Sequence, residues 1–428
     1  MLERLFRLHS HGTTVRTEIL AGCTTFLTAA YIIFVNPNIL AAAGMDAPAL
    51  TTVTCLVAAL ATLLIALWAN APLMMAPGMG LNAFFTYSLV IGHNIPWQTA
   101  LGVVFLSGCV FLLLTWLGVR ERMVRAIPTS LRLAAGVGIG LFIAFIGLKN
   151  LGLIVHDSNV LVRLGPFTMQ ALFGLGGLLL AVLLERRRIR GALLIAILAT
   201  TVAGMLAGLG PWPTGLIALP PSPAPIAFQL DIVSALSIGL WSSIFSFMFI
   251  DLFDSLGTML AVCREAGMVD KQGELINLPR MLTADAIATV CGALLGTSTT
   301  TTYIESASGV AQGGRTGLTG VTTALCFLSA AFFSPLIAVV PAFATAPALI
   351  VVGIFMLRGI GQLDFYDLSE ALPAFLTILL MPLTFSIATG LAFGFVSYVL
   401  LRLFSGRARE CDPYLIGAAL LSAVSLAF

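Results

Sequence analysis

Charged side chains are scarce in this 428-residue chain. Asp, Glu, Lys and Arg together make up 9% of the residues, whereas hydrophobic residues make up 59%. Soluble domains carry about 25% charged residues, so this composition, with a mean hydropathy of +1.04, excludes a soluble globular domain. The net charge of +2 is not gathered into a basic stripe, which argues against a nucleic-acid partner. The sequence therefore predicts an integral membrane protein embedded in a lipid bilayer.

The residues that build metal centres and enzyme active sites are few and scattered. Seven cysteines include no C-x-x-C pair and fall mostly within apolar runs, where a thiol packs as a small core residue. The four histidines lie at the N-terminus or in predicted loops, without metal-ligand spacing. The chain has no G-x-x-x-x-G-K-[ST] loop and no visible nucleophile–base pair. We therefore expect no metal, no cofactor and no enzymatic activity, so transport would draw on an ion or substrate gradient.

Long apolar runs, in contrast, fill the chain. A membrane-spanning helix needs about 20 predominantly apolar residues. The runs that meet or approach this length are 18–39, 50–69, 97–118, 128–148, 167–184, 191–208, 233–260, 281–296, 317–340, 345–358, 371–385 and 386–403. Two interrupted segments, 72–92 and 298–313, bring the predicted total to fourteen spans. The final apolar run, Tyr414 to Phe428, has only 15 residues and follows a charged stretch, so we expect it to lie at the membrane surface.

Arginines at the ends of these runs predict the orientation of the chain. If the fourteen spans alternate in direction, four arginine groups fall on one side of the membrane. These are Arg4, Arg7 and Arg16; Arg120, Arg122 and Arg125; Arg186, Arg187, Arg188 and Arg190; and Arg402, Arg407 and Arg409. The positive-inside rule makes that side the cytoplasm. Both termini would then be cytoplasmic, in a plasma membrane such as the bacterial inner membrane.

The order of the spans divides the chain into two halves of seven. The predicted divisions are a cytoplasmic N-terminal segment (1–17), a first seven-span repeat (18–208), an extracytoplasmic loop (209–232), a second repeat (233–403) and a cytoplasmic tail with a short apolar helix (404–428). An odd number of spans per half makes the second repeat inverted relative to the first. Residues 134–154 resemble residues 346–365, and the interrupted segments come third in each half.

Polar residues break the third span of each half. Ser298 to Gly309 reads STTTTYIESASG, and residues 76–85 read APGMGLNAFF. Backbone at membrane depth is tolerated only where it is buried in protein or lines a cavity, and discontinuous helices form the midplane sites of many transporters. We expect 299–302 to form a short strand paired with 73–77. The predicted fold is an all-α membrane protein with short strands at two broken helices.

The candidates for substrate binding come mainly from these broken segments. They are Glu305, Asp254, Asn82, Ser306, Tyr303, Phe84 and Gly80. Glu305 opens the second broken helix, whose positive end would stabilise a carboxylate. Asn82 offers a donor and acceptors, or it is a helix cap. Gly80 would allow close backbone approach. Phe84 and Tyr303 could stack a planar ring, although such aromatic residues more often only pack.

Four acids fall at predicted membrane depth: Asp251, Asp254, Asp285 and Glu305. A charge at the centre of a span costs roughly 2.5–3.5 kcal/mol on insertion scales, so such residues are functional candidates by default. The alternative is that each is only paired with a hydroxyl or backbone amide between helices. Asp251 shares a helix face with Asp254, and we expect Asp254 to face the substrate and Asp251 to support it. The candidates for proton coupling are Asp254, Glu305 and Asp285.

Three long motifs in order carry a family resemblance: APGMGLNAFF (76–85), DLFDSLGTM (251–259) and GTSTTTTYIESASGVAQGGRTGLT (296–319). Together they resemble the AzgA-like branch of nucleobase–cation symporter family 2, the purine permeases. The similarity covers essentially the whole chain. It implies fourteen spans in two inverted repeats, a core domain and a gate domain, uptake of a purine base with protons, and a homodimer.

The resemblance also implies roles for particular residues. Glu305 would accept hydrogen bonds from ring N–H groups of the purine, and Asp254 would be the second carboxylate facing the substrate or the proton. The family's uracil transporters have a histidine one turn after the acid of the eighth helix, where this chain has Thr258. Proton coupling would therefore rest on Asp254, Glu305 or Asp285.

Other functions remain open at this point. An anion exchanger on the same fold would be expected to have a cationic or neutral site, whereas this chain has acids there. A channel would need a continuous polar pore, and an enzyme would need a catalytic cluster. Among purine permeases, adenine, hypoxanthine and guanine are all candidate substrates. Adenine has an exocyclic amine where the other two bases have an oxo group, and a single side chain could decide between them.

Overall fold

The computed structural model describes residues 2–118, 126–270, 275–407 and 411–427. Within these ranges most of the regular structure is helical, and two short two-stranded sheets accompany it. The arginines at 120, 122, 125 and 409, which the orientation argument used, lie outside the described residues. The orientation in the membrane therefore stays a prediction.

Ten helical segments of the described chain are long and apolar enough to cross a membrane. They are Val15–Ala41, Ala47–Trp68, Trp97–Trp116, Thr129–Asn150, Met169–Arg186, Trp241–Glu265, Leu278–Leu295, Gly317–Ala338, Ala342–Gln362 and Ile387–Phe404. Shorter apolar helices at Met79–Gly92, Ala192–Leu206 and Leu368–Leu383 match three more predicted spans. A multi-pass helical membrane protein is thus confirmed, while the count of fourteen spans stays a prediction.

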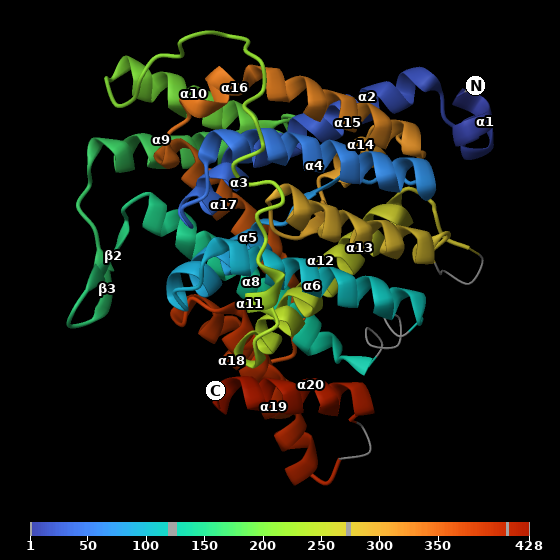
Figure 1. Cartoon of the computed structure of the whole chain (residues 1–428), viewed down its shortest axis with the longest axis vertical. Helices are drawn as coiled ribbons and strands as arrows, with labels where there is room; N and C mark the ends of the chain where they lie inside the picture. Colours follow the sequence, from blue (N-terminus) through green and yellow to red (C-terminus); the bar gives the residue numbers. More distant parts are fainter. Residues whose placement is uncertain (1, 119–125, 271–274, 408–410, 428) are drawn as a thin grey trace.

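The helices form two groups (Figure 1). The first, which we call the core, contains α2 (Val15–Ala29), α3 (Ile32–Ala41), α4 (Ala47–Trp68), α6 (Trp97–Trp116), α12 (Trp241–Glu265), α13 (Leu278–Leu295) and α15 (Gly317–Ala330). The second, which we call the gate, contains α8 (Thr129–Asn150), α9 (Met169–Arg186), α10 (Ala192–Leu206), α17 (Ala342–Leu357), α18 (Leu368–Leu383) and α19 (Ile387–Phe404). Each group draws helices from both halves of the chain, as interleaved repeats require.

Small residues let the central gate helices approach closely. A Cβ added at Gly140 of α8 would lie 2.9 Å from the carbonyl oxygen of Gly353 on α17, and one added at Gly353 would lie 2.5 Å from the oxygen of Gly140. Only glycine fits at such a contact, which is typical of helix pairs in membranes. These glycines belong to the two stretches whose sequences resemble each other, 134–154 and 346–365, so matching parts of the two halves pack together.

Two short strands cross inside the core. β1 (Met75–Pro77) pairs antiparallel with β4 (Thr300–Thr302), with Met75 opposite Thr302 and Pro77 opposite Thr300. Both strands are fully buried, and side chains take up the backbone groups that the ladder leaves: Thr62 Oγ1 accepts from the Met75 amide at 3.0 Å. The predicted strand pair is confirmed, with each strand slightly shorter than expected, and its polar backbone is satisfied as membrane depth demands.

A short helix follows each strand. After β1 come α5 (Met79–Ala83) and a π-helical turn (Phe84–Gly92), and after β4 comes α14 (Ser306–Ala311). The sequence did not predict the π-helix, nor the hairpin of β2 (Ile154–Asp157) and β3 (Leu161–Leu164), which projects from the left side of the molecule in Figure 1. The final apolar run forms α20 (Pro413–Ala427), which packs on α19.

Candidate functional site

A cavity of about 360 Å³ lies between the core and the gate. Its core wall consists of Tyr31, Met79, Gly80, Asp254, Thr258 and residues 301–305, and its gate wall of Ile143, Val352, Phe355, Met356 and Arg358. The core wall is made where the two crossing strands end and the short helices begin. The cavity therefore sits at the broken segments, with polar groups on the core side and a largely apolar gate side.

Glu305 faces this cavity from the turn between β4 and α14. Its side chain is half-buried, and the hydroxyl of Tyr31 donates to its Oε1 at 2.5 Å. The positive end of the following helix, which the sequence predicts to stabilise this carboxylate, contributes little, because α14 has only six residues and the macrodipole grows from aligned peptides along a helix. A tyrosine, rather than a long helix, holds the carboxylate.

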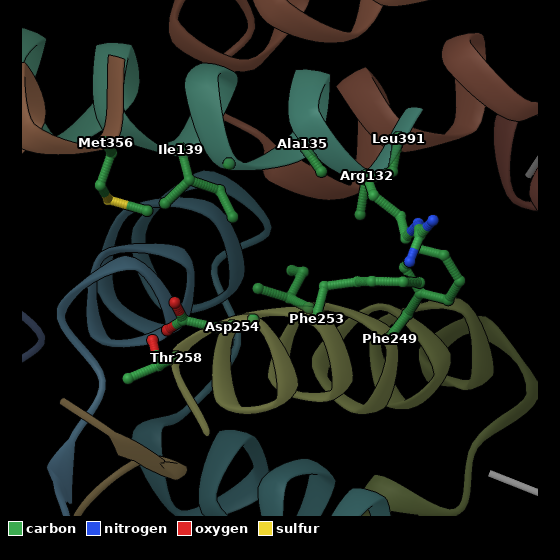
Figure 2. Close-up of a pocket in the computed structure, with 12 residues that line it drawn as sticks. Arg132, Ala135, Ile139, Phe249, Phe253, Asp254, Thr258, Met356 and Leu391 are labelled. Atoms are coloured by element: carbon green, nitrogen blue, oxygen red, sulfur yellow. The ribbon is translucent and has the colours of Figure 1, made fainter. Parts of the chain in front are cut away.

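Asp254 is the second carboxylate of the cavity. It lies in the middle of α12, where the hydroxyl of Thr301 on β4 hydrogen-bonds to it. Thr258 lies one turn later on the same face, and the two side chains stand next to each other in Figure 2. The broken second segment and the unbroken helix α12 thus each supply one acid to the same space.

The other two membrane-depth acids lie behind the cavity wall. Asp251 and Asp285 are 1% and 0% exposed. Ser255 donates to Asp285 Oδ1 at 2.7 Å, and Thr289 donates to Asp251 Oδ2 at 3.1 Å. Neither acid lines the cavity. Through these hydroxyl groups the two acids tie α12 to α13.

The first broken segment places its predicted binding residues differently. Asn82 is fully buried; its Nδ2 donates to Asn36 Oδ1 at 2.5 Å, and Ser298 donates to its Oδ1. Phe84 packs on Phe247 of α12, with ring centroids 4.7 Å apart. Neither residue lines the cavity, whereas Gly80 does. Asn82 therefore joins the two broken segments rather than pointing at the space between core and gate.

In the second segment, Ser306 and Tyr303 act mainly as braces. Ser306 Oγ accepts from the amide of Met74 at 2.9 Å and donates to the carbonyl of Tyr303 at 2.7 Å. Ser306 does not line the cavity. Tyr303 does line it, while its hydroxyl donates to the carbonyl of Pro77 at 2.6 Å. The ring of Tyr303 is thus left to face the cavity.

Two polar residues of the cavity, Tyr31 and Arg358, were not among the candidates from the sequence. Tyr31 falls at the break between α2 and α3, inside what looks like one apolar run. Arg358 follows α17 and lines the cavity from the gate, with its guanidinium 4.8 Å from the ring centroid of Phe355. The sequence offered a signal for each residue: a tyrosine inside one membrane span (Tyr31) and a single arginine at the end of another (Arg358). Among the described residues, no group of three or more His, Cys, Asp or Glu side chains is placed to hold a metal ion.

Comparisons with known proteins agree with this arrangement. Residues 16–393 match the model of the Permease family (Xan_ur_permease). The chain is 44% identical to Adenine permease AdeP of Escherichia coli K12, over 100% of this chain and 96% of that protein. It is 43% identical to Guanine/hypoxanthine permease PbuG of Bacillus subtilis 168, over 97% of each.

A solved structure shares the fold. The transmembrane domain of a cyanobacterium bicarbonate transporter, BicA, aligns with a TM-score of 0.67 over 87% of this chain and 96% of that one, at 17% identity. That identity supports a common fold and nothing about substrate. The family match, which covers most of the chain, and the long alignments to curated permeases decide the class. This chain belongs to the xanthine/uracil permease family and is a membrane transporter, not an enzyme.

Proposed function

We propose that this protein carries a purine base across the membrane together with protons, and that the base binds between Glu305 and Asp254. The observation that carries the proposal is that both carboxylates line one cavity between core and gate. A neutral purine is a flat apolar ring edged with N–H donors and ring acceptors. An apolar slot with a few well-placed polar groups is the usual way to bind such a ligand.

Glu305 would be the main acceptor for ring N–H groups. Tyr31 occupies Oε1, so Oε2 would receive the base. Fixing the carboxylate before the ligand arrives reduces the entropy lost on binding. Phe355 and Met356 on the gate would cover the apolar faces of the ring, and Tyr303 would pack from the core.

The substrate class rests on the relatives. The two permeases are named for adenine and for guanine/hypoxanthine, and we extend that class, purine bases, to this chain. Thr258 and Arg358 are two cavity residues able to donate to an oxo group, and neither has another proposed role in binding the base. They are therefore the side chains to change when testing preference for an oxo-purine over adenine.

Proton coupling would rest on Asp254. It lines the cavity, whereas Asp285 is buried behind it, so Asp254 can exchange a proton without disrupting the α12–α13 contact. Glu305 would be the second group able to take part. Base and proton would be coupled if each binds better in the presence of the other.

An anion exchanger is the competing function, since the fold is shared with a bicarbonate transporter. The cavity argues against anion exchange, because two carboxylates would repel an anion and Arg358 alone would attract it.

The remaining parts of the proposal concern assembly and topology. They are a homodimer in a bacterial inner membrane, both termini cytoplasmic, and repeats at 18–208 and 233–403 joined by an extracytoplasmic loop at 209–232.

The test is uptake of labelled adenine, hypoxanthine and guanine by bacteria that lack their own purine permeases, with and without a protonophore. We expect saturable uptake of at least one base, which collapses when the proton gradient is removed. Uptake that survives the protonophore would leave purine transport standing and overturn the coupling to protons. If no base enters while the protein is present in the membrane, purine transport itself is wrong, and pyrimidines and anions become the substrates to test.

A further inference from the structure

A second, smaller space adjoins the cavity. It is a slot of about 180 Å³ between α8 of the gate and α12 of the core. The slot shares Asp254, Thr258 and Met356 with the larger cavity. Figure 2 shows Asp254 and Thr258 at one end, and Arg132 beside Phe249 at the other. Asp254 is therefore reached from two directions, once through each space.

Two glycines keep the slot open. Gly136 on α8 and Gly257 on α12 both line it, and a Cβ added at either would meet no atom within 4 Å outside its own helix turn. Neither glycine lines the larger cavity. At about 30 Å³ of liquid volume per molecule, the slot has room for several waters. Side chains could thus be added here to fill the slot while the residues around the base stay unchanged.

The two ends of the slot are polar and its walls are not. Phe249, Phe253 and Leu391 form the walls. At the far end, Arg132 Nη2 donates to Thr129 at 2.8 Å, while its Nε is buried without an acceptor among the described residues. A buried unpaired N–H is costly, and water in the slot would satisfy it. The polar ends and the orphaned N–H both indicate that the slot is hydrated.

We propose that this slot is the route by which a proton leaves Asp254, separate from the cavity that holds the base, and that Arg132 is the fixed positive charge that favours release. The proposal rests on the proposed symport. The O–H bond of Asp254 breaks, its proton passes to a water of the slot, and the carboxylate remains on α12. While a base fills the larger cavity, the slot still reaches Asp254.

The charges around Asp254 explain why a cation is needed. The titratable groups around it include Asp251 on α12, Asp285 on α13, Tyr303 and Glu305 after β4, and Tyr31 before α3. The gate contributes Arg132 through the slot and Arg358 through the cavity. The other helices that pack on α12 add Arg402 and Tyr398 of α19, which both contact Glu370, Tyr414 of α20 and Cys109 of α6. Asp285 and Glu305 repel a negative charge on Asp254, whereas Arg132 and Arg358 carry the opposite charge.

The first test fills the slot. Gly136→Leu and Gly257→Leu are compared with Gly176→Leu, a control on α9 where an added Cβ also meets nothing. Each protein is reconstituted in vesicles that contain a pH dye. We measure equilibrium binding of labelled purine, exchange of internal for external purine at equal pH, and net uptake driven by a pH gradient. Exchange needs movement of the loaded carrier but no release of the proton.

We expect binding and exchange to stay within about twofold of wild type, while net uptake and purine-induced proton flux fall about tenfold in the two slot variants alone. If exchange is lost together with net uptake, the slot serves the movement of the core against the gate. If net uptake is unchanged, protons leave by another route. Either result overturns the proposal. Failure of the wild type to bind any purine would instead overturn the proposed function.

The second test removes the charge. Arg132→Gln leaves the slot open but takes away the cation at its end. We expect unchanged exchange and a shift of the pH optimum of net uptake by about one unit to the alkaline side, because Asp254 then holds its proton more tightly. Arg132→Lys keeps the charge and should restore the wild-type optimum. An unshifted optimum in Arg132→Gln would remove Arg132 from the mechanism.

Discussion

The two broken segments have the same backbone plan but different tasks. Each has a three-residue strand followed by a short helix, and the strands pair with one another. In the first segment Asn82 is committed to Asn36 and Ser298. In the second, Glu305 and the ring of Tyr303 face the cavity. The two segments thus share a backbone plan and pair at membrane depth, whereas the carboxylate and the tyrosine ring that face the cavity come from the second segment.

The largest effect should come from the second segment. Glu305→Gln keeps the shape of the side chain but removes the negative charge that would receive the N–H groups of the base. We expect purine affinity to fall by about a hundredfold or more, since a charged hydrogen bond and its desolvated partner are both affected. Equilibrium binding to purified protein measures this.

The matched control is Glu265→Gln at the end of α12, where the side chain is exposed. Its affinity and its thermal unfolding should equal those of wild type. If Glu305→Gln binds purine normally while remaining folded, binding of the base does not depend on this carboxylate. The second segment would then not differ from the first in binding the base.

Asp254→Asn should have the next largest effect, on coupling rather than on binding. The variant keeps an acceptor for Thr301 but can neither gain nor lose a proton. We expect accumulation against a gradient to be lost and the remaining uptake to become independent of external pH. Initial rates across a pH series, with Glu265→Gln as reference, measure this. A pH profile with the wild-type shape would assign the proton to Glu305 or Asp285 instead.

Asn82→Ala tests the first segment. It leaves Asn36 and Ser298 without their shared partner inside the core. The loss of buried hydrogen bonds should lower the free energy of unfolding by about 1–3 kcal/mol, seen as a lower melting temperature in detergent. Purine affinity of the folded fraction should change little. A large loss of affinity at unchanged stability would show that Asn82 reaches the base after all.

Composition and patterning predicted much of this molecule, for reasons that are local. Twenty-residue apolar runs mark spans because the bilayer sets their length, and the polar run at 298–302 marks a strand because β-branched hydroxyl residues disfavour helix at that point. Glu305 and Asp254 were found because a membrane-depth acid needs a reason to be there.

What the sequence left open depends on which way a side chain turns. Asn82 and Gly80 are two residues apart, yet only Gly80 lines the cavity. Tyr31 contacts Glu305 across 274 residues of chain, and no local pattern encodes such a pairing. The slot at Gly136 and Gly257 exists only after α8 and α12 come together. These features follow from tertiary packing, which a single sequence does not display.

The smallest effect, and the sharpest comparison of the two segments, comes from a single oxygen that joins them. Tyr303→Phe removes the hydroxyl that donates to Pro77 in the first segment but keeps the ring that lines the cavity. We expect a loss of about 1 kcal/mol in stability and purine affinity within about threefold of wild type.

Tyr31→Phe is the matched change, because it removes a hydroxyl that donates to Glu305 itself. Its affinity should fall about tenfold, since one charge-assisted hydrogen bond no longer holds the carboxylate in place. Equal effects of the two variants on affinity would mean that the strand crossing and the carboxylate act as one unit; unequal effects, in the order given, would show that the first segment supports the site and the second segment binds the base.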